Sequence, residues 1–276
     1  MKILSCGAGM QSTALALMSC ENKKEIKYKE VPVYDAIVFC DLGNEPEWVY
    51  RQVDFIKNAC EDAEIPFYIL DTHLHQDYLN NFGKRRVVSI PFWSVDENGK
   101  KGKMMRNCTL DYKINEIIKF VKYELLGYVK YQRVKNEDLK AHEMHLGFSL
   151  EEKYRCKENK HKMFINKFPL VDMKLTRADN YKYILEEWDL DTKASACCFC
   201  PFHTNYFFEY MKDNHKEQYQ SILEFDEMLE REQPNTKIRS KLYISKSRKR
   251  IKDLSDEDFK DKEVFDYRNK KIWNGF

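Results

Sequence analysis

Apolar runs alternate with amphipathic segments over residues 1–71 of the chain. Ile3 and Leu4 suit a buried strand, and the run at residues 35–41 (DAIVFCD) is typical of a parallel strand buried on both faces. Residues 65–71 (IPFYILD) are predicted to form a third strand. Between these two runs, apolar residues recur at helical spacing after Pro46. This β-α-β-α-β order predicts an α/β fold with a doubly wound, mostly parallel, Rossmann-like sheet.

The rest of the chain continues the alternation less regularly. Residues 72–105 are rich in glycine and charge, which predicts a long excursion or lid with a short strand near residues 87–93. Apolar residues at helical spacing predict a helix over residues 110–127, with Gly127 as its stop. Further elements are expected at residues 142–149, 167–172 and 176–188. We expect one domain over residues 1–215 and a helical C-terminal extension over residues 216–276.

The turn after the first strand suits a phosphate. Gly7 and Gly9 let the backbone approach a ligand, and the next helix opens with Gln11, Ser12 and Thr13, where free N–H groups would face an anion. No lysine follows Gly9 as a Walker A motif requires, and Ser12 stands where a dinucleotide fingerprint needs a third glycine. A nucleotide-binding loop and glycines that serve the turn alone both remain open.

A second polar loop follows the strand at residues 35–41. Ligands of doubly wound sheets bind at the carboxyl ends of the strands, so Asp41 and Glu45 are expected near the nucleotide. Asp41 could contact a ribose or a magnesium ion, or it could be an ordinary loop or cap acid.

The composition favours a reducing compartment. The chain has 276 residues, a net charge of +2 and nine cysteines, with no apolar run of transmembrane length. Polar residues 11–13 interrupt the first apolar run, which argues against a secretory signal. We therefore expect a cytoplasmic protein without a membrane partner, whose clustered cysteines bind metal or react.

The strongest cysteine motif is Cys197-Cys198-Phe199-Cys200, followed by His203. Thiolates at this spacing bind zinc or an iron–sulfur cluster, and a further ligand would come from Cys108 or His203. A thioredoxin-type redox pair is a weaker alternative, because that motif directly follows a strand. The isolated cysteines are expected to be core residues: Cys6, Cys20, Cys40, Cys60 and Cys156.

Six ordered segments carry a family resemblance: SCGAGMQST, FCDLGNEPEW, RNCTLDYKI, HLGFSLEEKYR, FPLVDMKLTRADNYKYI and SACCFCPFHTN. Over residues 1–215 the chain resembles the phosphoadenosine phosphosulfate reductase-like family of the adenine nucleotide α-hydrolase superfamily, which has a PP-loop. It is most similar to the small, often phage-encoded members.

The resemblance implies roles for individual residues. The PP-loop would bind the pyrophosphate of ATP, or the phosphosulfate of phosphoadenosine phosphosulfate, with magnesium. Residues implied in nucleotide binding are Ser5, Gly7, Gly9, Ser12, Thr13, Asp41, Glu45, Gly147 and Arg177. Residues implied in catalysis are Gln11, Ser12, Arg106, Lys113 and Arg155. Residues implied in holding a 4Fe–4S cluster, or zinc as the alternative, are Cys108, Cys197, Cys198, Cys200 and His203.

Three departures from the family pattern shape the expected function. Gln11 replaces the usual acid of the PP-loop, Asn107 replaces one cluster cysteine, and no cysteine follows Cys200. A sulfonucleotide reductase needs a thiolate nucleophile near its C-terminus, so sulfonucleotide reduction is a secondary alternative. We expect cleavage of ATP to AMP and pyrophosphate, which activates an acceptor by adenylation for nucleic-acid or nucleobase modification, with sulfur transfer favoured.

The expected partners follow from that chemistry. The acceptor would be tRNA, DNA or a nucleobase, with a sulfur-donor protein, and assembly with a second copy of the chain stays open. A basic stretch over residues 237–252 with an aromatic insert could face a polyanion, could close over the nucleotide, or could be a solvated surface. The alternative to an enzyme is a protein that binds an adenine nucleotide without turning it over.

Overall fold

The computed structural model describes residues 1–264, which form two compact units. The first unit comprises Met1–Cys40, Glu47–Leu70 and Glu116–Ser195. The second comprises Asp41–Pro46, Asp71–Asn115 and the described residues from Ala196 onward. Each unit is therefore assembled from several segments, whereas the sequence analysis expected a single division near residue 215.

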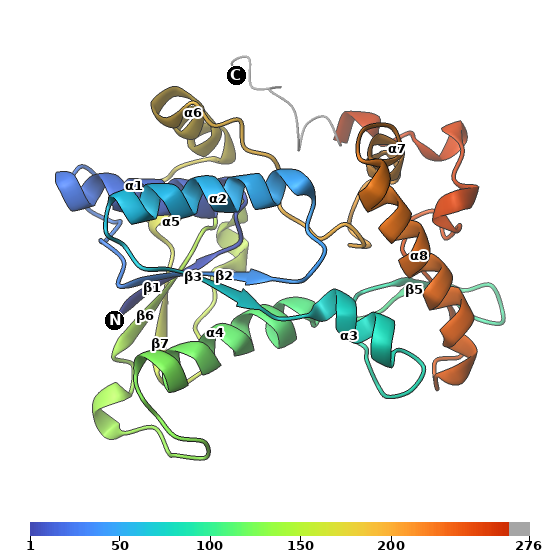
Figure 1. The fold of residues 1–276 in the computed structure, drawn as a ribbon, viewed down its shortest axis with the longest axis horizontal. Coiled ribbons are helices and arrows are strands. Elements are labelled where there is room, and N and C mark those ends of the chain that lie inside the picture. The colour runs from blue at the N-terminus through green and yellow to red at the C-terminus, as the bar shows by residue number, and fades with distance from the viewer. Residues whose placement is uncertain (265–276) are drawn as a thin grey trace. The chain divides into compact units, whose positions relative to one another are not determined.

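A sheet of five parallel strands forms the centre of the first unit (Figure 1). Its order is β3-β2-β1-β6-β7, and β1 pairs with β2 on one side and β6 on the other. The strands are β1 (Lys2–Cys6), β2 (Ala36–Asp41), β3 (Phe67–Asp71), β6 (His142–Leu146) and β7 (Phe164–Lys167). The predicted doubly wound α/β fold is confirmed. The strand β7 lies outside the predicted ranges.

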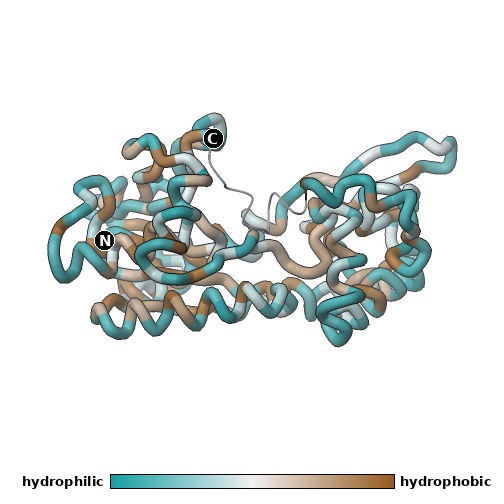
Figure 2. The backbone as a smooth tube through the Cα atoms, turned by 90° about the horizontal axis from the view of Figure 1, so that it is seen from above, coloured by the Kyte–Doolittle hydropathy of each residue, from teal (hydrophilic) through white to brown (hydrophobic). Residues whose placement is uncertain are grey.

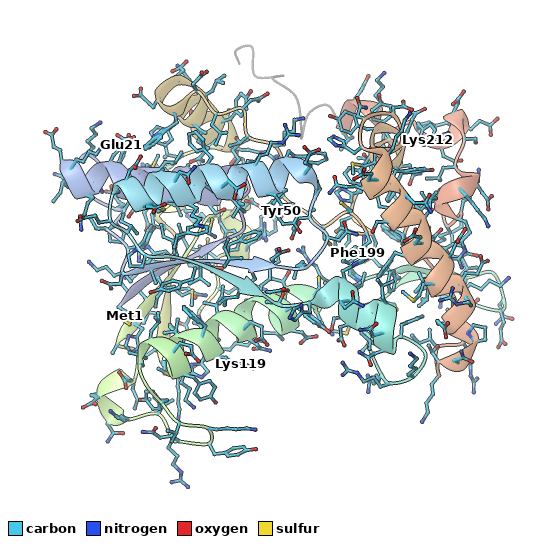
Figure 3. The ribbon with its side chains drawn as sticks, in the orientation of Figure 1. Met1, Glu21, Tyr50, Lys119, Phe199 and Lys212 are labelled. Atoms are coloured by element: carbon cyan, nitrogen blue, oxygen red, sulfur yellow. The ribbon has the colours of Figure 1, made fainter. Side chains whose placement is uncertain are left out.

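Helices cover both faces of this sheet. Figure 1 shows α1 and α2 on one side and α4 on the other, and Figure 3 shows Glu21 and Lys119 on these opposite layers. The helices are α1 (Met10–Lys24), α2 (Glu47–Asp62), α4 (Asn115–Phe120), α5 (Pro169–Asp172) and α6 (Arg177–Trp188). Ile117 of α4 packs in a buried cluster with Ile3 and Val38, so the α4 side of β1 and β2 is removed from water.

The helix predicted over residues 110–127 is present with an altered winding. Wide π-type turns at Leu110–Ile114 and Val121–Leu125 flank α4, and Gly127 adopts a φ of +67° beyond the last turn. π-type turns inside helices are frequent at functional sites, and the first one here begins two residues after Cys108.

The second unit contains a small antiparallel sheet and three helices within its described residues. The sheet has the order β5-β4-β8. Its elements are α3 (Leu74–Asn81), β4 (Trp93–Val95), β5 (Lys101–Lys103), α7 (Asn205–Asn214), α8 (Lys216–Glu232) and β8 (Lys241–Tyr243). The helix α8 confirms a helical start to the predicted C-terminal extension, whereas α7 lies before residue 216. Single 3-10 turns occur at Asn136–Asp138, Leu150–Arg155, Gln233–Asn235, Ile251–Asp253 and Asp256–Asp258.

The expected excursion over residues 72–105 is a folded part of the second unit. It holds α3 and the β4–β5 hairpin, and the predicted strand near residues 87–93 was wrong except at Trp93. Ile90 donates its N–H to the Tyr78 hydroxyl at 2.8 Å, so this backbone bonds to a side chain instead of a sheet.

Hydrophobic and hydrophilic positions alternate along the helical turns of the tube (Figure 2). This pattern is typical of helices with one face on a core and one in water. No helix within residues 1–264 combines the length and the apolar character needed to cross a bilayer.

Candidate functional site

The loop between β1 and α1, which we call the glycine loop (residues 7–9), has the form of an anion-binding turn. Ala8 is held at a φ of +50°, and the Gly7 N–H donates to Ser12 Oγ at 3.1 Å while that hydroxyl donates to the Gly9 carbonyl. The N–H groups of Met10 and Gln11, in the first turn of α1, have no acceptor among the described residues. These N–H groups and the positive end of the helix dipole suit a phosphate.

Gly147, which directly follows β6, packs against the start of α1 beside the glycine loop. An ideal Cβ on Gly147 would lie 2.8 Å from Ser12 N and 3.0 Å from the carbonyl carbon of Gln11. Gly147 must therefore lack a side chain for the end of β6 to lie against the start of α1. Thr13 Oγ1 is buried beside this contact and has no hydrogen-bond partner among the described residues. The structure thus brings together four of the residues predicted for nucleotide binding: Gly7, Ser12, Thr13 and Gly147.

Two residues that support the loop were missed from the sequence. Gln52 on α2 is 2% exposed, and its Nε2 donates to the Ala8 carbonyl while its Oε1 accepts from Lys193 N. Ser195 Oγ lies 2.7 Å from the position that a Cβ on Gly9 would take. The sequence did contain a signal for Gln52, because it lies among the apolar positions of the predicted helix. A polar side chain that is buried there needs hydrogen-bond partners.

Two carboxylates connect the predicted polar residues of the first unit. Glu152 accepts a hydrogen bond from Gln11 Nε2 at 3.0 Å and forms an ion pair with Arg155. Glu151 accepts from the Arg177 backbone N–H at 3.1 Å, at the start of α6. Gln11 and Arg155 thus share Glu152, which the sequence analysis did not single out. Ser5 lies on β1 and pairs in register with Leu146.

The second unit gathers the predicted cysteines. Phe199 is fully buried and stacks on Phe225 with ring centroids 4.6 Å apart, which anchors the Cys197-Cys198-Phe199-Cys200 segment in an aromatic core. The Cys200 N–H donates to the Cys197 carbonyl at 2.9 Å, and this turn places the two thiols close enough for each to shift the pKa of the other.

Cys108 belongs to the same group. Its N–H donates to the Ser89 carbonyl at 2.8 Å, and the charge on its thiolate form raises the pKa of Cys197. We refer to Cys108, Cys197 and Cys200 as the thiol cluster. The role predicted for these three thiols, to hold a metal or a cluster, stays a prediction.

The members of the thiol cluster differ in acidity. The hydrogen bond from Cys197, helped by the Phe202 backbone N–H and the Arg106 guanidinium, lowers the pKa of Cys200 to about 7. Two effects raise the pKa of the Cys197 thiol: its interaction with the Cys200 thiol and its burial. Cys200 is thus the more acidic thiol of the pair, and a thiolate is the reactive form of cysteine.

A buried acid and a lysine lie in the same unit. Glu45 is 1% exposed, and burial raises the pKa of its carboxyl although Lys113 Nζ lies 3.8 Å from its Oε1. Asp41 is half-buried and accepts from the Gly43 N–H at 2.8 Å. Asp41, Glu45 and Lys113 all belong to the second unit. Their predicted roles at the nucleotide and in catalysis stay predictions.

The other predicted metal ligands have different surroundings. Cys198 is fully buried, which raises the pKa of its thiol, and its N–H donates to the Asn44 carbonyl. His203 Nε2 lies 2.9 Å from the Cys197 carbonyl, and its ring stacks on Phe207 at 3.5 Å. Within residues 1–264, no three His, Cys, Asp or Glu side chains are arranged to hold a metal ion. The thiol chemistry suits zinc or a cluster, but the ligand set is incomplete as it stands, so no step below depends on a metal.

The isolated cysteines have the surroundings expected of core residues. Cys6, Cys20, Cys40 and Cys60 are buried, as predicted, and Cys156 is half-buried.

We expect Cys200 to be alkylated fastest among the thiols of metal-free, reduced protein. Its rate with iodoacetamide should rise with pH and level off above pH 7, because its pKa is about 7. Cys197→Ala removes the hydrogen-bond donor and should move the midpoint to higher pH. Mass spectrometry of peptides quenched at successive pH values gives this profile. The same midpoint in both proteins would contradict the assigned cause.

Comparison with known proteins returns no relative: no family model matches the chain, and no curated protein matches it.

Proposed function

We propose that the protein binds ATP at the glycine loop, cleaves it to AMP and pyrophosphate, and uses the energy to activate a nucleic-acid or nucleobase acceptor for sulfur transfer. The observation that carries the proposal is the loop itself. The N–H groups of Met10 and Gln11, which follow the loop at the start of α1, lack acceptors among the described residues, and Gly147 is packed against the same turn where no side chain fits. The resemblance to PP-loop enzymes supports ATP over other anions.

The first step is adenylation. An acceptor oxygen attacks the α-phosphorus, a new P–O bond forms, and the bond between the α-phosphorus and the bridging oxygen breaks as pyrophosphate leaves. The loop N–H groups stabilise the charge on the phosphates, which is the main form of catalysis open to such a site. Magnesium would neutralise further phosphate charge, and Glu152 is the carboxylate that the structure connects to the loop through Gln11.

The second step uses the Cys197 and Cys200 thiols. A donor persulfide first transfers its outer sulfur to the Cys200 thiolate. The terminal sulfur on Cys200 attacks the activated carbon of the acceptor, a C–S bond forms, and the C–O bond breaks as AMP leaves. Cys197 then attacks the Cys200 sulfur, which leaves the terminal sulfur on the acceptor and forms a Cys197–Cys200 disulfide. A thiol reductant resets the pair. The contact between these two thiols and the low pKa of Cys200 support this order.

The test separates the two steps. The protein is incubated with magnesium, ATP labelled at the α-phosphate, a persulfide donor carrying labelled sulfur, and pools of tRNA, DNA or nucleobases. We expect labelled AMP and pyrophosphate to form together with labelled acceptor. Cys200→Ser should stop sulfur incorporation and preserve the adenylated acceptor, whereas Cys156→Ser, a matched change in the first unit, should preserve both.

Other outcomes point to other functions. ATP that binds tightly without forming AMP would support a nucleotide-binding protein without turnover. Tight binding of phosphoadenosine phosphosulfate with weak binding of ATP would support a sulfonucleotide enzyme. Sulfur incorporation in Cys200→Ser would contradict the role of this thiol.

A further inference from the structure

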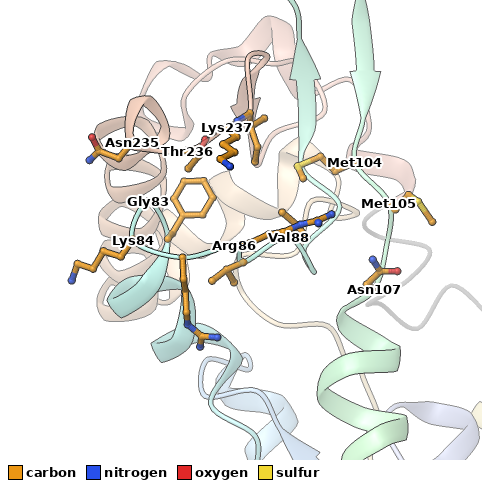
Figure 4. Close-up of a pocket in the computed structure, with 14 residues that line it drawn as sticks. Gly83, Lys84, Arg86, Val88, Met104, Met105, Asn107, Asn235, Thr236 and Lys237 are labelled. Carbon is orange, nitrogen blue, oxygen red and sulfur yellow. Dashed lines mark hydrogen bonds between the residues drawn. The ribbon is translucent and has the colours of Figure 1, made fainter.

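Two cavities in the second unit share part of their walls. The first has a volume of about 780 Å³ and lies between the segment after α3, the segment after β5 and the segment after α8 (Figure 4). The second has a volume of about 540 Å³ and continues along the last of these segments to β8. Thr236 and Ile238 line both cavities. The cavities are therefore adjacent, and we refer to the two together as the track. Each has the size of a small-ligand pocket, about 300–1,000 Å³.

The track is strongly cationic although the net charge of the chain is only +2. Nine lysines and arginines line it, against two carboxylates, Glu230 and Asp253, which both lie in the second cavity. Such a local concentration of charge attracts polyanions.

Several of these cations already have structural partners. Arg85 forms an ion pair with Asp77, Lys249 with Asp258, and Arg250 with Asp226. Six others form no ion pair with any residue that the structure describes: Lys84, Arg86, Lys237, Arg239, Lys241 and Arg248. Arg248 donates to the Ser94 and Gly102 carbonyls, and the other five are exposed, three in the first cavity and two in the second. Their charge is available to a ligand.

The first cavity adds apolar surface to this charge. Phe82, Val88 and Met104 line it, together with Met105, which is 77% exposed. Exposed thioethers are polarisable and pack well on flat rings. A ligand that suits the track therefore carries both repeated negative charge and flat apolar groups.

We propose that an unpaired nucleic-acid strand lies along this track, with its phosphates at Arg86, Lys237, Arg239 and Lys241 and a base in the first cavity. The inference rests on the proposed function and identifies its acceptor as a polynucleotide rather than a free nucleobase. A single strand fits better than a duplex, because its bases can leave the stack and place a face on the apolar wall. Asn107 lines the first cavity and precedes Cys108 of the thiol cluster, so a base held there lies on the segment that carries one of the thiols.

The test measures strand binding without ATP. Fluorescence anisotropy follows labelled single-stranded RNA and DNA of about 20 nucleotides, and duplexes of the same sequence, on the full chain. The variants Arg86→Gln/Lys237→Gln and Arg239→Gln/Lys241→Gln each remove two charges from one cavity. The control Lys29→Gln/Lys57→Gln removes two exposed charges from the first unit.

We expect each cavity variant to weaken single-strand binding roughly tenfold at low salt, and the control to change it less than about twofold. The slope of log affinity against log salt should fall by about 1.4 in each cavity variant, since each phosphate contact on a single strand contributes about 0.7. All three variants should keep the wild-type melting temperature, because the changed side chains are exposed.

Three results would overturn the inference: equal affinity in all variants, equal losses in cavity and control variants, or tighter binding of duplex than of single strand. The inference and the proposed function fail separately. If the protein cleaves ATP but the cavity variants bind a single strand as tightly as the wild type, the inference fails and the proposed function stands. If the cavity variants weaken strand binding but the protein never forms AMP, the inference is supported and the proposed function fails.

Discussion

Gly147→Ala is expected to weaken ATP binding by more than about tenfold, or ~1.4 kcal/mol, and to lower the free energy of unfolding by about 1–3 kcal/mol. The added methyl would lie 2.8 Å from Ser12 N and 3.0 Å from both the Ser12 Cα and the Gln11 carbonyl carbon. These are backbone atoms, which cannot rotate away as a side chain can. The end of β6 and the start of α1 must therefore separate, which moves the N–H groups that we assign to the phosphates.

The control for this prediction is Gly99→Ala. A Cβ at Gly99 meets no atom within 4 Å, but its φ of +77° makes any side chain strained. It should cost about 1 kcal/mol of stability and leave ATP affinity unchanged. Calorimetric titration with a non-hydrolysable ATP analogue measures affinity, and denaturant unfolding measures stability. Wild-type affinity in Gly147→Ala would remove the glycine loop as the nucleotide site.

Gly9→Ala tests the same loop from its other side. The atom that its Cβ would meet is Ser195 Oγ at 2.7 Å, the end of a short side chain. This hydroxyl can turn to another rotamer, so we expect a smaller loss of affinity than in Gly147→Ala. The order of the two losses distinguishes a backbone collision from a side-chain collision.

The first unit could be predicted largely from local sequence patterns. The run at residues 35–41 is apolar because β2 lies inside the parallel sheet, whereas β3, from the run at residues 65–71, is an edge strand without a buried residue. The contact of Gly147 with the start of α1 could not be worked out from spacing, because it joins segments across most of the first unit. The family resemblance placed Gly147 among the residues implied in nucleotide binding, but it did not indicate this contact.

The second unit was harder to predict because its stabilising contacts are not local. The strands β5 (KGK) and β8 (KLY) are three residues long and carry no apolar run. They form because both pair with β4, and Arg248 donates to the Ser94 and Gly102 carbonyls across that sheet. Single-sequence periodicity cannot find such strands.

The thiol cluster shows which part of a site a motif can specify. The spacing of Cys197 and Cys200 correctly brought two thiols together, and the resemblance added Cys108. The motif did not reveal that Phe199 anchors the turn against Phe225, nor that Arg106 helps to lower the pKa of Cys200. Those effects come from segments far apart in the chain, and they help to decide which thiol of the pair has the lower pKa.

Asp226→Ala is expected to be the most destabilising of the substitutions considered, at about 3–5 kcal/mol. Asp226 is 3% exposed, and its carboxylate accepts from Arg250 Nη1 at 3.0 Å and from the Ile251 N–H at 2.8 Å. Alanine would leave the Arg250 guanidinium, which is 9% exposed, without its buried counter-charge. Denaturant unfolding measures the loss.

Two further proteins show whether the loss comes from the unpaired charge. Asp213→Ala changes an exposed carboxylate on α7 of the same unit and should alter stability by no more than about 0.5 kcal/mol. The double variant Asp226→Leu/Arg250→Met replaces both charges with apolar side chains and should recover most of the stability lost in Asp226→Ala. If the double variant is as unstable as Asp226→Ala, the loss comes from packing or from the Ile251 hydrogen bond. If it recovers, Arg250 has a structural role on the wall of the second cavity, and the nucleic-acid contacts fall to the exposed cations that we assign to the phosphates: Arg86, Lys237, Arg239 and Lys241.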